Sequence, residues 1–258
     1  MTTAFEVDGA IAILTFNRPE ARNAMTWEMY DALVAACDRV DADASIRVFI
    51  LRGAGGKAFI AGTDISQFQS FRTRDDALTY EQRLDGTLDR LERVTKPTIA
   101  QIDGVAAGGG CAIAICCDLR LATPDATIGV PVARTLGNCL SGATTSRLVD
   151  MVGPARAKEL LFTGRLAGAA EAAELGLFTR VIAADALESV VRETALQLGA
   201  NAPLTIRASK EMIRRIAEHR RLPAGRDHDL IEMCYLSDDF RSAVEAFAAK
   251  RKPSWAGR

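Results

Sequence analysis

Histidine is nearly absent from this sequence, which contains two in 258 residues. His219 and His228 both stand among charged residues near the C-terminal end, a context typical of surface positions. Zinc sites and Ser-His-Asp triads depend on histidine as a ligand or as a base. The sequence therefore favours neither a zinc enzyme nor a triad hydrolase.

Neither sign of charge is in excess, because 32 Lys and Arg balance 33 Asp and Glu. Without a basic field, nucleic acids and anionic membrane surfaces are not favoured partners. Long apolar runs are also missing: the longest uncharged run, Gly104–Cys117, is too short to cross a bilayer. We predict a protein with no nucleic-acid partner and no membrane segment.

Cysteine occurs six times but never with C-x-x-C spacing. Most of these residues lie in apolar segments, so we predict reduced, buried thiols. Residues 1–8 carry two acids and no positively charged region ahead of an apolar stretch, which does not match a secretory signal. We therefore expect a cytoplasmic protein.

Short apolar segments alternate with helical patterns, which indicates an α/β fold. The strand candidates are residues 5–16 around a turn at Asp8-Gly9, 48–51, 98–102, 119–122, 127–128 and 178–182. From about Leu187 the pattern is wholly helical. We predict a core over residues 1–195 and a C-terminal helical region over residues 196–258 that packs on the core or on another subunit.

Three helical regions have recognisable limits. Thr26 is a good N-cap for a helix that carries Met29, Leu33 and Val40 on one face. Residues 67–83 form a polar stretch, and we expect a helix after them, over the leucines of residues 84–91. Gly153-Pro154 is predicted to separate two helices, over residues 147–152 and 155–161.

Three consecutive glycines, Gly108 to Gly110, follow one apolar run and open another. Glycine lets another group approach the backbone closely, and the first N–H groups of a following helix lack intrahelical partners. Such donors suit an anion or a developing oxyanion. Close packing between a helix and a sheet would explain the glycines equally well. A second loop of small residues, Phe59–Ile65, favours the first interpretation, since two such turns can each direct one N–H at a single carbonyl oxygen.

The glycines at residues 53–56 do not form a nucleotide-binding loop. Ala58 stands where the dinucleotide pattern needs its third glycine, and Leu51 replaces the first glycine of the phosphate-loop pattern. A nicotinamide-dependent enzyme is therefore disfavoured.

A series of motifs spans nearly the whole chain. In order they are Asn17-Arg18-Pro19 with Asn23-Ala24-Met25, Ala61-Gly62-Thr63-Asp64, Lys96-Pro97 with Asp103-Gly104, Gly108-Gly109-Gly110-Cys111, Cys117-Asp118, Gly164-Arg165, Ala172 to Gly176 and the tail Phe247–Lys252. In this order and spacing the sequence resembles the enoyl-CoA hydratase/isomerase (crotonase) superfamily. Together the motifs are far more specific than any one of them.

The resemblance implies a spiral of ββα units whose C-terminal helices build a homotrimer, often paired into a hexamer. It implies an acyl-CoA thioester as ligand, with coenzyme A as part of the substrate and no other cofactor. Thr63 and Gly109 match the two residues whose N–H groups form the family's oxyanion hole. The substrate-binding positions that it implies further are Ala21, Arg22, Ala24, Ala61, Asp64, Ile65, Ser66 and, from a neighbouring subunit, Lys250.

The sequence departs from the hydratases at the two positions where they carry catalytic glutamates. Ala112 and Val132 stand there, and neither side chain exchanges a proton. The loop from Val132 to Ser141 is also one residue longer than the hydratase pattern. Possible substitutes in it are Arg134, Asn138 and Ser141.

Two residues near these positions have plainer explanations. We expect Asp64 to cap the next helix. Cys139 has no histidine in its sequence neighbourhood to activate it as a nucleophile.

Two hypotheses follow. The first is an acyl-CoA enzyme that stabilises an enolate by a route other than the usual hydration, such as decarboxylation or a substrate-assisted step. The alternative is a non-catalytic acyl-CoA-binding or scaffold protein.

Overall fold

The structure is a computed structural model that describes residues 1–258. Its strands are β1 (Thr3–Asp8), β2 (Ile11–Phe16), β3 (Val48–Gly53), β4 (Ala58–Ile60), β5 (Thr98–Ile102), β6 (Val105–Ala107), β7 (Leu119–Ala122), β8 (Thr127–Gly129), β9 (Ala167–Gly168) and β10 (Arg180–Val181). Its helices are α1 (Trp27–Ala42), α2 (Arg74–Glu92), α3 (Gly109–Cys116), α4 (Val132–Thr135), α5 (Gly142–Thr163), α6 (Ala169–Glu174), α7 (Leu187–Ala200), α8 (Pro203–His219), α9 (His228–Tyr235) and α10 (Asp238–Ala248). Short 3-10 turns are η1 (Pro19–Ala21), η2 (Ile65–Ser70) and η3 (Ala184–Ala186).

The chain contributes strands alternately to two sheets, and helices follow them, which confirms the predicted α/β class. The larger sheet has the strand order β1-β2-β3-β5-β7-β10, and the smaller has the order β4-β6-β8-β9. Three times in succession the chain runs through the larger sheet and then directly into the smaller one, as β3–β4, β5–β6 and β7–β8. Each pair is followed by a helix, so the repeated unit is strand–strand–helix.

Strand pairing explains why three loops meet on one side of the molecule. β4, β6 and β8 are parallel neighbours, and each ends at the same edge of the smaller sheet. The antiparallel pair β1–β2 closes at Asp8-Gly9 as predicted, with Gly9 at φ +59°. Only this hairpin and the β8–β9 pair are antiparallel.

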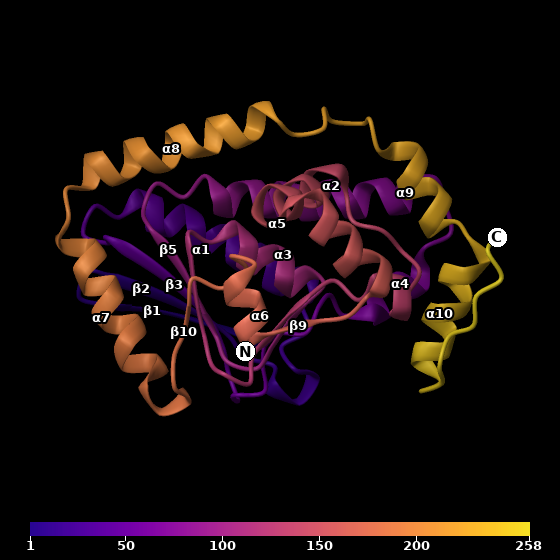
Figure 1. The fold of residues 1–258 in the computed structure, drawn as a ribbon, viewed down its shortest axis with the longest axis horizontal. Helices are drawn as coiled ribbons and strands as arrows, with labels where there is room; N and C mark the ends of the chain where they lie inside the picture. Colours follow the sequence, from indigo (N-terminus) through magenta and orange to yellow (C-terminus); the bar gives the residue numbers. More distant parts are fainter.

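Helices cover both faces of the larger sheet (Figure 1). Helices α1, α2 and α3 share a core cluster of 50 buried residues with the inner strand faces. Helix α7 packs on β2, β3, β5 and β7, where Val48, Ile99 and Val191 belong to a second, smaller buried cluster. The predicted boundary between residues 195 and 196 falls inside α7, which spans Leu187–Ala200. Ala195 is buried in the smaller cluster, so this helix packs with the core.

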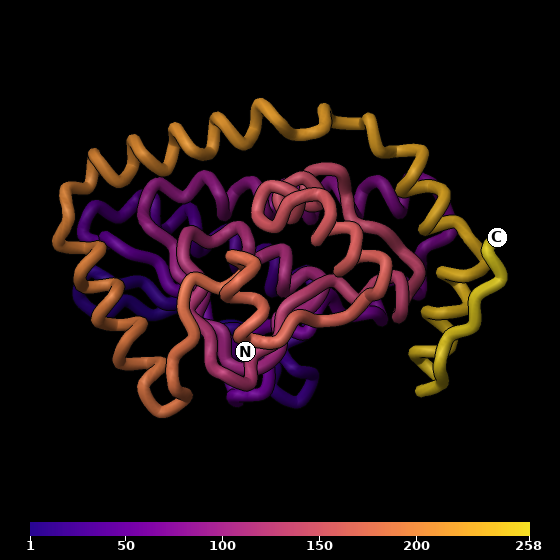
Figure 2. The backbone as a smooth tube through the Cα atoms, in the orientation of Figure 1, coloured from indigo at the N-terminus to yellow at the C-terminus, as the bar shows by residue number.

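The chain after α7 runs along the outside of the molecule. In Figures 1 and 2, α8 passes along one edge, from α7 at one end towards α9 and α10 at the other. No residue of α8 is buried, and its apolar face is open: Leu204, Met212, Ile213 and Ile216 are each more than half exposed. The helix is tied to the body by polar contacts, such as Lys210 with Asp118 at 2.7 Å.

Two local expectations are confirmed. Thr26 caps α1, its side chain accepting from the N–H of Met29. Gly153, at φ +75°, kinks α5 into the two expected helical segments. None of the helices is both long and apolar enough to cross a bilayer.

Three expectations are wrong. The loop expected over Phe59–Ile65 begins inside β4, since Phe59 and Ile60 are strand residues. The strand predicted over residues 178–182 is reduced to the two residues of β10. The polar stretch 67–83 is largely helical, because α2 already begins at Arg74 behind a capping box formed by Thr73 and Asp76. The side chains of Tyr80 and Glu81 are buried on this first half of α2.

Candidate active site

Three motifs of the sequence come together at the carboxyl edge of the smaller sheet. β4 leads into Ala61–Asp64, β6 leads into the glycine triplet, and β8 leads into Pro131 and Val132. Because parallel strands end at one edge, segments 70 residues apart in sequence become neighbours there. Ligands of open α/β sheets bind at such an edge.

The glycines of the triplet have different roles. Gly108 adopts φ +52° and ψ −118°, a backbone conformation that favours glycine, and caps the start of α3. A Cβ on Gly110 would overlap the carbonyl oxygen of Ile60 and lie 2.7 Å from the Cβ of that residue. Close helix–sheet packing therefore explains Gly110, whereas Gly109 faces the loop that follows β4.

Gly109 and Thr63 present two backbone N–H groups side by side. A Cβ built on Gly109 would lie 3.7 Å from the backbone nitrogen of Thr63. Gly109 is the first residue of α3, so its N–H has no partner within the helix. The N–H of Thr63 donates to no carbonyl of the chain. Both groups can therefore donate to a bound ligand.

Buried hydroxyls fix the Thr63 loop. Thr63 Oγ1 lies 2.8 Å from Tyr30 Oη and 2.9 Å from Tyr80 Oη. Burial raises the pKa of both tyrosines well above the ordinary range, so the two phenols stay neutral. Since the Thr63 side chain is held by α1 and α2, its N–H keeps one direction without help from a ligand.

A cavity of about 270 Å³ opens beside the two N–H groups. Hydrophobic residues make up 12 of the 21 that line it, and no Lys, Arg or His is among them. Ala112 and Val132, where the family resemblance leads us to expect the hydratase glutamates, both line this cavity. Neither supplies an acid or a base.

Glu81 is the one carboxyl that lines this cavity, and sequence reasoning missed it. Its side chain is buried on α2 and accepts a hydrogen bond from the hydroxyl of Tyr235. Burial raises the pKa of Glu81 to about 8, and the negative charges of Asp85 and Asp227 contribute to the rise. The signal in the sequence was the capping pair Thr73 and Asp76, which starts α2 early enough to include it.

The suggested substitutes in the Val132–Ser141 loop are placed differently from one another. Asn138 lines the cavity, and its Nδ2 donates to Tyr235 Oη at 3.0 Å. Its Oδ1 is buried without a protein partner, so it can accept from a ligand. Arg134 is exposed on α4 and does not line the cavity.

Ser141 does not reach the cavity either. It is buried as the N-cap of α5, where its hydroxyl donates to Asp85 at 2.7 Å and accepts from the N–H of Thr144. Cys139 does line the cavity, but a hydrogen bond with Cys234 and burial raise the pKa of the Cys139 thiol far above its usual range. It therefore stays protonated and a poor nucleophile.

The structure places the expected substrate-binding residues in or beside the cavity, except at the tail. Ala61 and Ile65 line the cavity beside Thr63 and Gly109. The segment with Ala21, Arg22 and Ala24 lies against it, with the N–H of Ala61 donating to the carbonyl of Arg22. Lys250 lies exposed after α10, outside the cavity.

Asp64 and Ser66 stand at the start of η2 and do not line the cavity. Asp64 accepts from the N–H of Ser66 and so caps η2, as expected. It also pairs with Arg18 at 3.1 Å, so its carboxylate serves the loop structure.

Comparison with known proteins decides the family. The enoyl-CoA hydratase/isomerase family model matches residues 6–258. The chain belongs to the enoyl-CoA hydratase/isomerase family. It is 34% identical over 253 residues to the short-chain-enoyl-CoA hydratase of Clostridium acetobutylicum, covering 96% of this chain and 94% of that protein.

Solved structures of this family share the fold over the whole chain. An enoyl-CoA hydratase/carnitine racemase from Magnetospirillum magneticum has 35% identity and a TM-score of 0.81, covering 100% of this chain and 96% of that one. A methylmalonyl-CoA decarboxylase complexed with 2S-carboxypropyl-CoA has 28% identity and a TM-score of 0.91, covering 100% and 99%. The family resemblance of the sequence is thus confirmed.

Proposed function

We propose that this protein binds a 2-carboxyacyl-CoA and decarboxylates it, with the N–H groups of Thr63 and Gly109 holding the thioester oxygen. The observation that carries the proposal is the pair of unpaired N–H groups beside a cavity without a cationic side chain. Loss of CO₂ breaks the bond between the carboxyl carbon and the α-carbon. The electron pair moves into the thioester, whose oxygen becomes the enolate oxygen.

Two preorganised donors favour this step, because negative charge moves onto the oxygen that they contact. One such donor typically contributes about 2.7–4 kcal/mol to the transition state. The carboxylate of the substrate would meet the apolar wall around Ala112 and Val132, where no cation stabilises it. An environment that solvates a carboxylate poorly favours its conversion to neutral CO₂.

Decarboxylation also agrees with the absence of glutamates at positions 112 and 132. Hydration needs one group to activate water and one to protonate carbon, and the family resemblance assigns those roles to the positions of Ala112 and Val132. C–C cleavage needs neither group. The similarity in fold to a methylmalonyl-CoA decarboxylase, at a TM-score of 0.91, supports the same reaction class.

We further propose a homotrimer, or a hexamer of two trimers, in the cytoplasm. The open apolar face of α8, with Ile213 68% and Ile216 60% exposed, supports association of subunits. In such an assembly Lys250 is proposed to reach the coenzyme A of a neighbouring subunit. Coenzyme A enters as part of the substrate, and no other cofactor is proposed.

The test measures CO₂ release from methylmalonyl-CoA together with calorimetric binding of propionyl-CoA. Gly109→Pro removes one N–H, and Gly109→Ala is its matched control, because both variants add a Cβ, which would lie 2.7 Å from Tyr30 Oη, and only the Ala variant keeps the donor. We expect the Pro variant to lose about 10²–10³-fold in kcat relative to the Ala variant. Binding without any CO₂ release would support the alternative, a non-catalytic acyl-CoA-binding protein. Absence of binding would refute both.

A further inference from the structure

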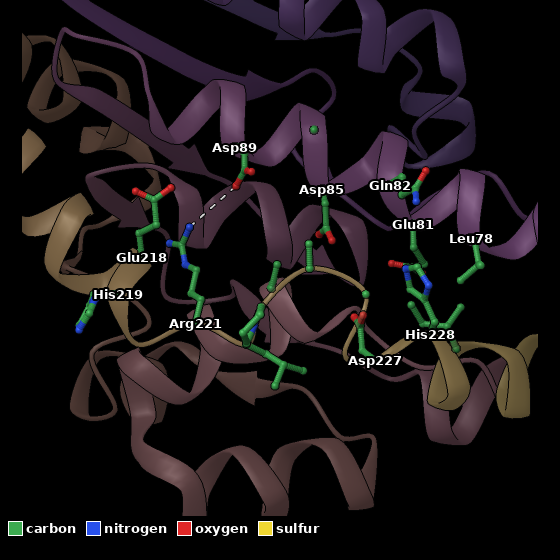
Figure 3. Close-up of a pocket in the computed structure, with 17 residues that line it drawn as sticks. Leu78, Glu81, Gln82, Asp85, Asp89, Glu218, His219, Arg221, Asp227 and His228 are labelled. Carbon is green, nitrogen blue, oxygen red and sulfur yellow. Dashed lines mark ion pairs between the residues drawn. The ribbon is translucent and has the colours of Figure 1, made fainter.

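Glu81 lies in the wall between two cavities. It lines the 270 Å³ cavity beside Thr63 and Gly109, and it also lines a larger cavity of about 670 Å³ on the other side. Figure 3 shows this outer cavity, with Glu81, Asp85 and Asp89 projecting from α2 towards the segment that joins α8 to α9. Glu81 itself is 4% exposed.

The surroundings of Glu81 connect it to the N–H pair. The residue before it is Tyr80, whose hydroxyl shares a hydrogen bond of 2.9 Å with Thr63 Oγ1. The ring of Tyr80 lies 6.0 Å from the ring of Tyr235, whose hydroxyl donates to the Glu81 carboxyl. Asn138 donates in turn to that hydroxyl at 3.0 Å. One packed group of side chains therefore positions both the thioester-binding loop and the carboxyl.

No cation pairs with Glu81, in contrast to most acidic residues of this chain. The charged and titratable groups around it are Asp85 on its own helix, Asp227 and His228 across the outer cavity, Cys139 on the inner side, and the tyrosines Tyr30, Tyr80 and Tyr235. Arg221 also lines the outer cavity, but it pairs with Glu92. A buried carboxyl among negative neighbours holds its proton. Its pKa, raised to about 8 by burial, leaves it largely protonated at neutral pH.

We propose that Glu81 is the catalytic proton donor, which protonates the α-carbon of the enolate after CO₂ has left. This inference rests on the proposed function. The proton moves from the Glu81 carboxyl to the α-carbon as the enolate re-forms the thioester carbonyl, and Glu81 is left as a carboxylate. A proton from solvent, entering through the outer cavity, restores the acid. Overall, one 2-carboxyacyl-CoA and one proton give one acyl-CoA and one CO₂.

Other side chains of the cavity are less suited to this transfer. Tyr80 has its hydroxyl bound to Thr63, and burial raises the pKa of both Tyr80 and Tyr235 well above that of a useful acid. The incoming carboxylate of the substrate adds negative charge beside Glu81. Before CO₂ leaves, that charge strengthens its hold on the proton; afterwards the charge lies on the enolate, which the proton neutralises. The acid is thus retained for the step that needs it.

The deciding experiment is exchange of the α-protons of propionyl-CoA with D₂O, the reverse of the protonation step. It requires binding, the N–H pair and Glu81, but no decarboxylation. We expect the wild type to exchange one of the two α-protons, as followed by NMR, and Glu81→Gln to lose about 10²–10⁴-fold in exchange rate. Thr79→Ala, at an exposed position of α2 that lines neither cavity, is the matched control.

The pH profiles of the exchange rate and of the CO₂-release rate test the proton transfer itself, because a residue that only supports the fold would not set them. Exchange needs Glu81 as a carboxylate that removes the α-proton, so its rate is expected to rise with pH and level off above about 8. Turnover of methylmalonyl-CoA needs Glu81 as the acid that protonates the enolate, so the rate of CO₂ release is expected to fall over the same range. Glu81→Asp is expected to recover part of the exchange, which separates loss of the acid from misfolding.

The outcomes separate the two proposals. Exchange without CO₂ release would overturn the decarboxylation and keep Glu81 as the proton-transfer group. CO₂ release with equal exchange in the wild type and in Glu81→Gln would overturn the role of Glu81 alone. A wild type that shows neither activity would overturn both.

Discussion

Replacing Glu81 by Gln is expected to change how the free energy of unfolding depends on pH. The wild-type carboxyl has a pKa of about 8 in the folded protein, because it is buried without a cation, against an ordinary value of 4.5. The folded state therefore binds a proton more tightly than the unfolded state does. Glutamine has the same shape and no titrating group.

The sign of the effect follows from this order of the two pKa values. A raised folded-state pKa contributes stability that is fully present below about pH 4.5, is lost between 4.5 and about 8, and stays lost above. The two values differ by 3.5. At about 1.36 kcal/mol per pKa unit, the wild type loses up to about 5 kcal/mol relative to Glu81→Gln over this range.

The assay is urea unfolding of both proteins at a series of pH values from 4 to 9, at one protein concentration because the proposed subunit association would contribute to stability. The quantity of interest is the difference between the two free energies, in which all other titrating groups cancel. Thr79→Glu is the control, since it adds a carboxyl at an exposed position of the same helix outside both cavities and should follow the wild type. Two parallel curves for the wild type and Glu81→Gln would refute our reasoning about Glu81.

Three further predictions concern the glycines, the missing acids and the outer helix. Gly110→Ala should destabilise the protein by more than about 1–3 kcal/mol, since its Cβ overlaps backbone in β4, whereas Gly168→Ala, at φ −73° with open space around it, should meet no such overlap; thermal unfolding compares the two. The double variant with Ala112→Glu and Val132→Glu should gain hydration of crotonyl-CoA over the wild type, followed by loss of the enoyl-thioester absorbance; no gain would mean that the longer loop has also altered the cavity. Ile213→Asp with Ile216→Asp should dissociate the assembly in sedimentation experiments, and an unchanged mass would contradict our assignment of this face.

Much of the fold could be predicted because its signals are local. The β1–β2 hairpin depends on the Asp8-Gly9 turn, α1 depends on its Thr26 cap, and the kink of α5 depends on Gly153. The same holds for the glycine triplet, since positive φ at Gly108 and the contact of Gly110 with β4 are backbone requirements. Such features can be predicted from the sequence wherever the backbone needs one residue type at one position.

Contacts between distant segments decided the rest of the site. Ser141 has the same hydroxyl whether it faces a substrate or caps a helix, and only the position of Asp85 on α2 gives it the second role. Asn138 reaches the cavity because Tyr235, 97 residues further along the chain, accepts its hydrogen bond.

The sequence by itself determined the family and the α/β class, because these follow from motifs along the backbone. Through the family resemblance it also pointed to the N–H groups of Thr63 and Gly109. Tertiary structure alone decided the chemistry of Glu81. In a polar stretch it is one charged residue among many. It becomes a buried acid because α9, 154 residues away, places Tyr235 over it and leaves no cation within reach.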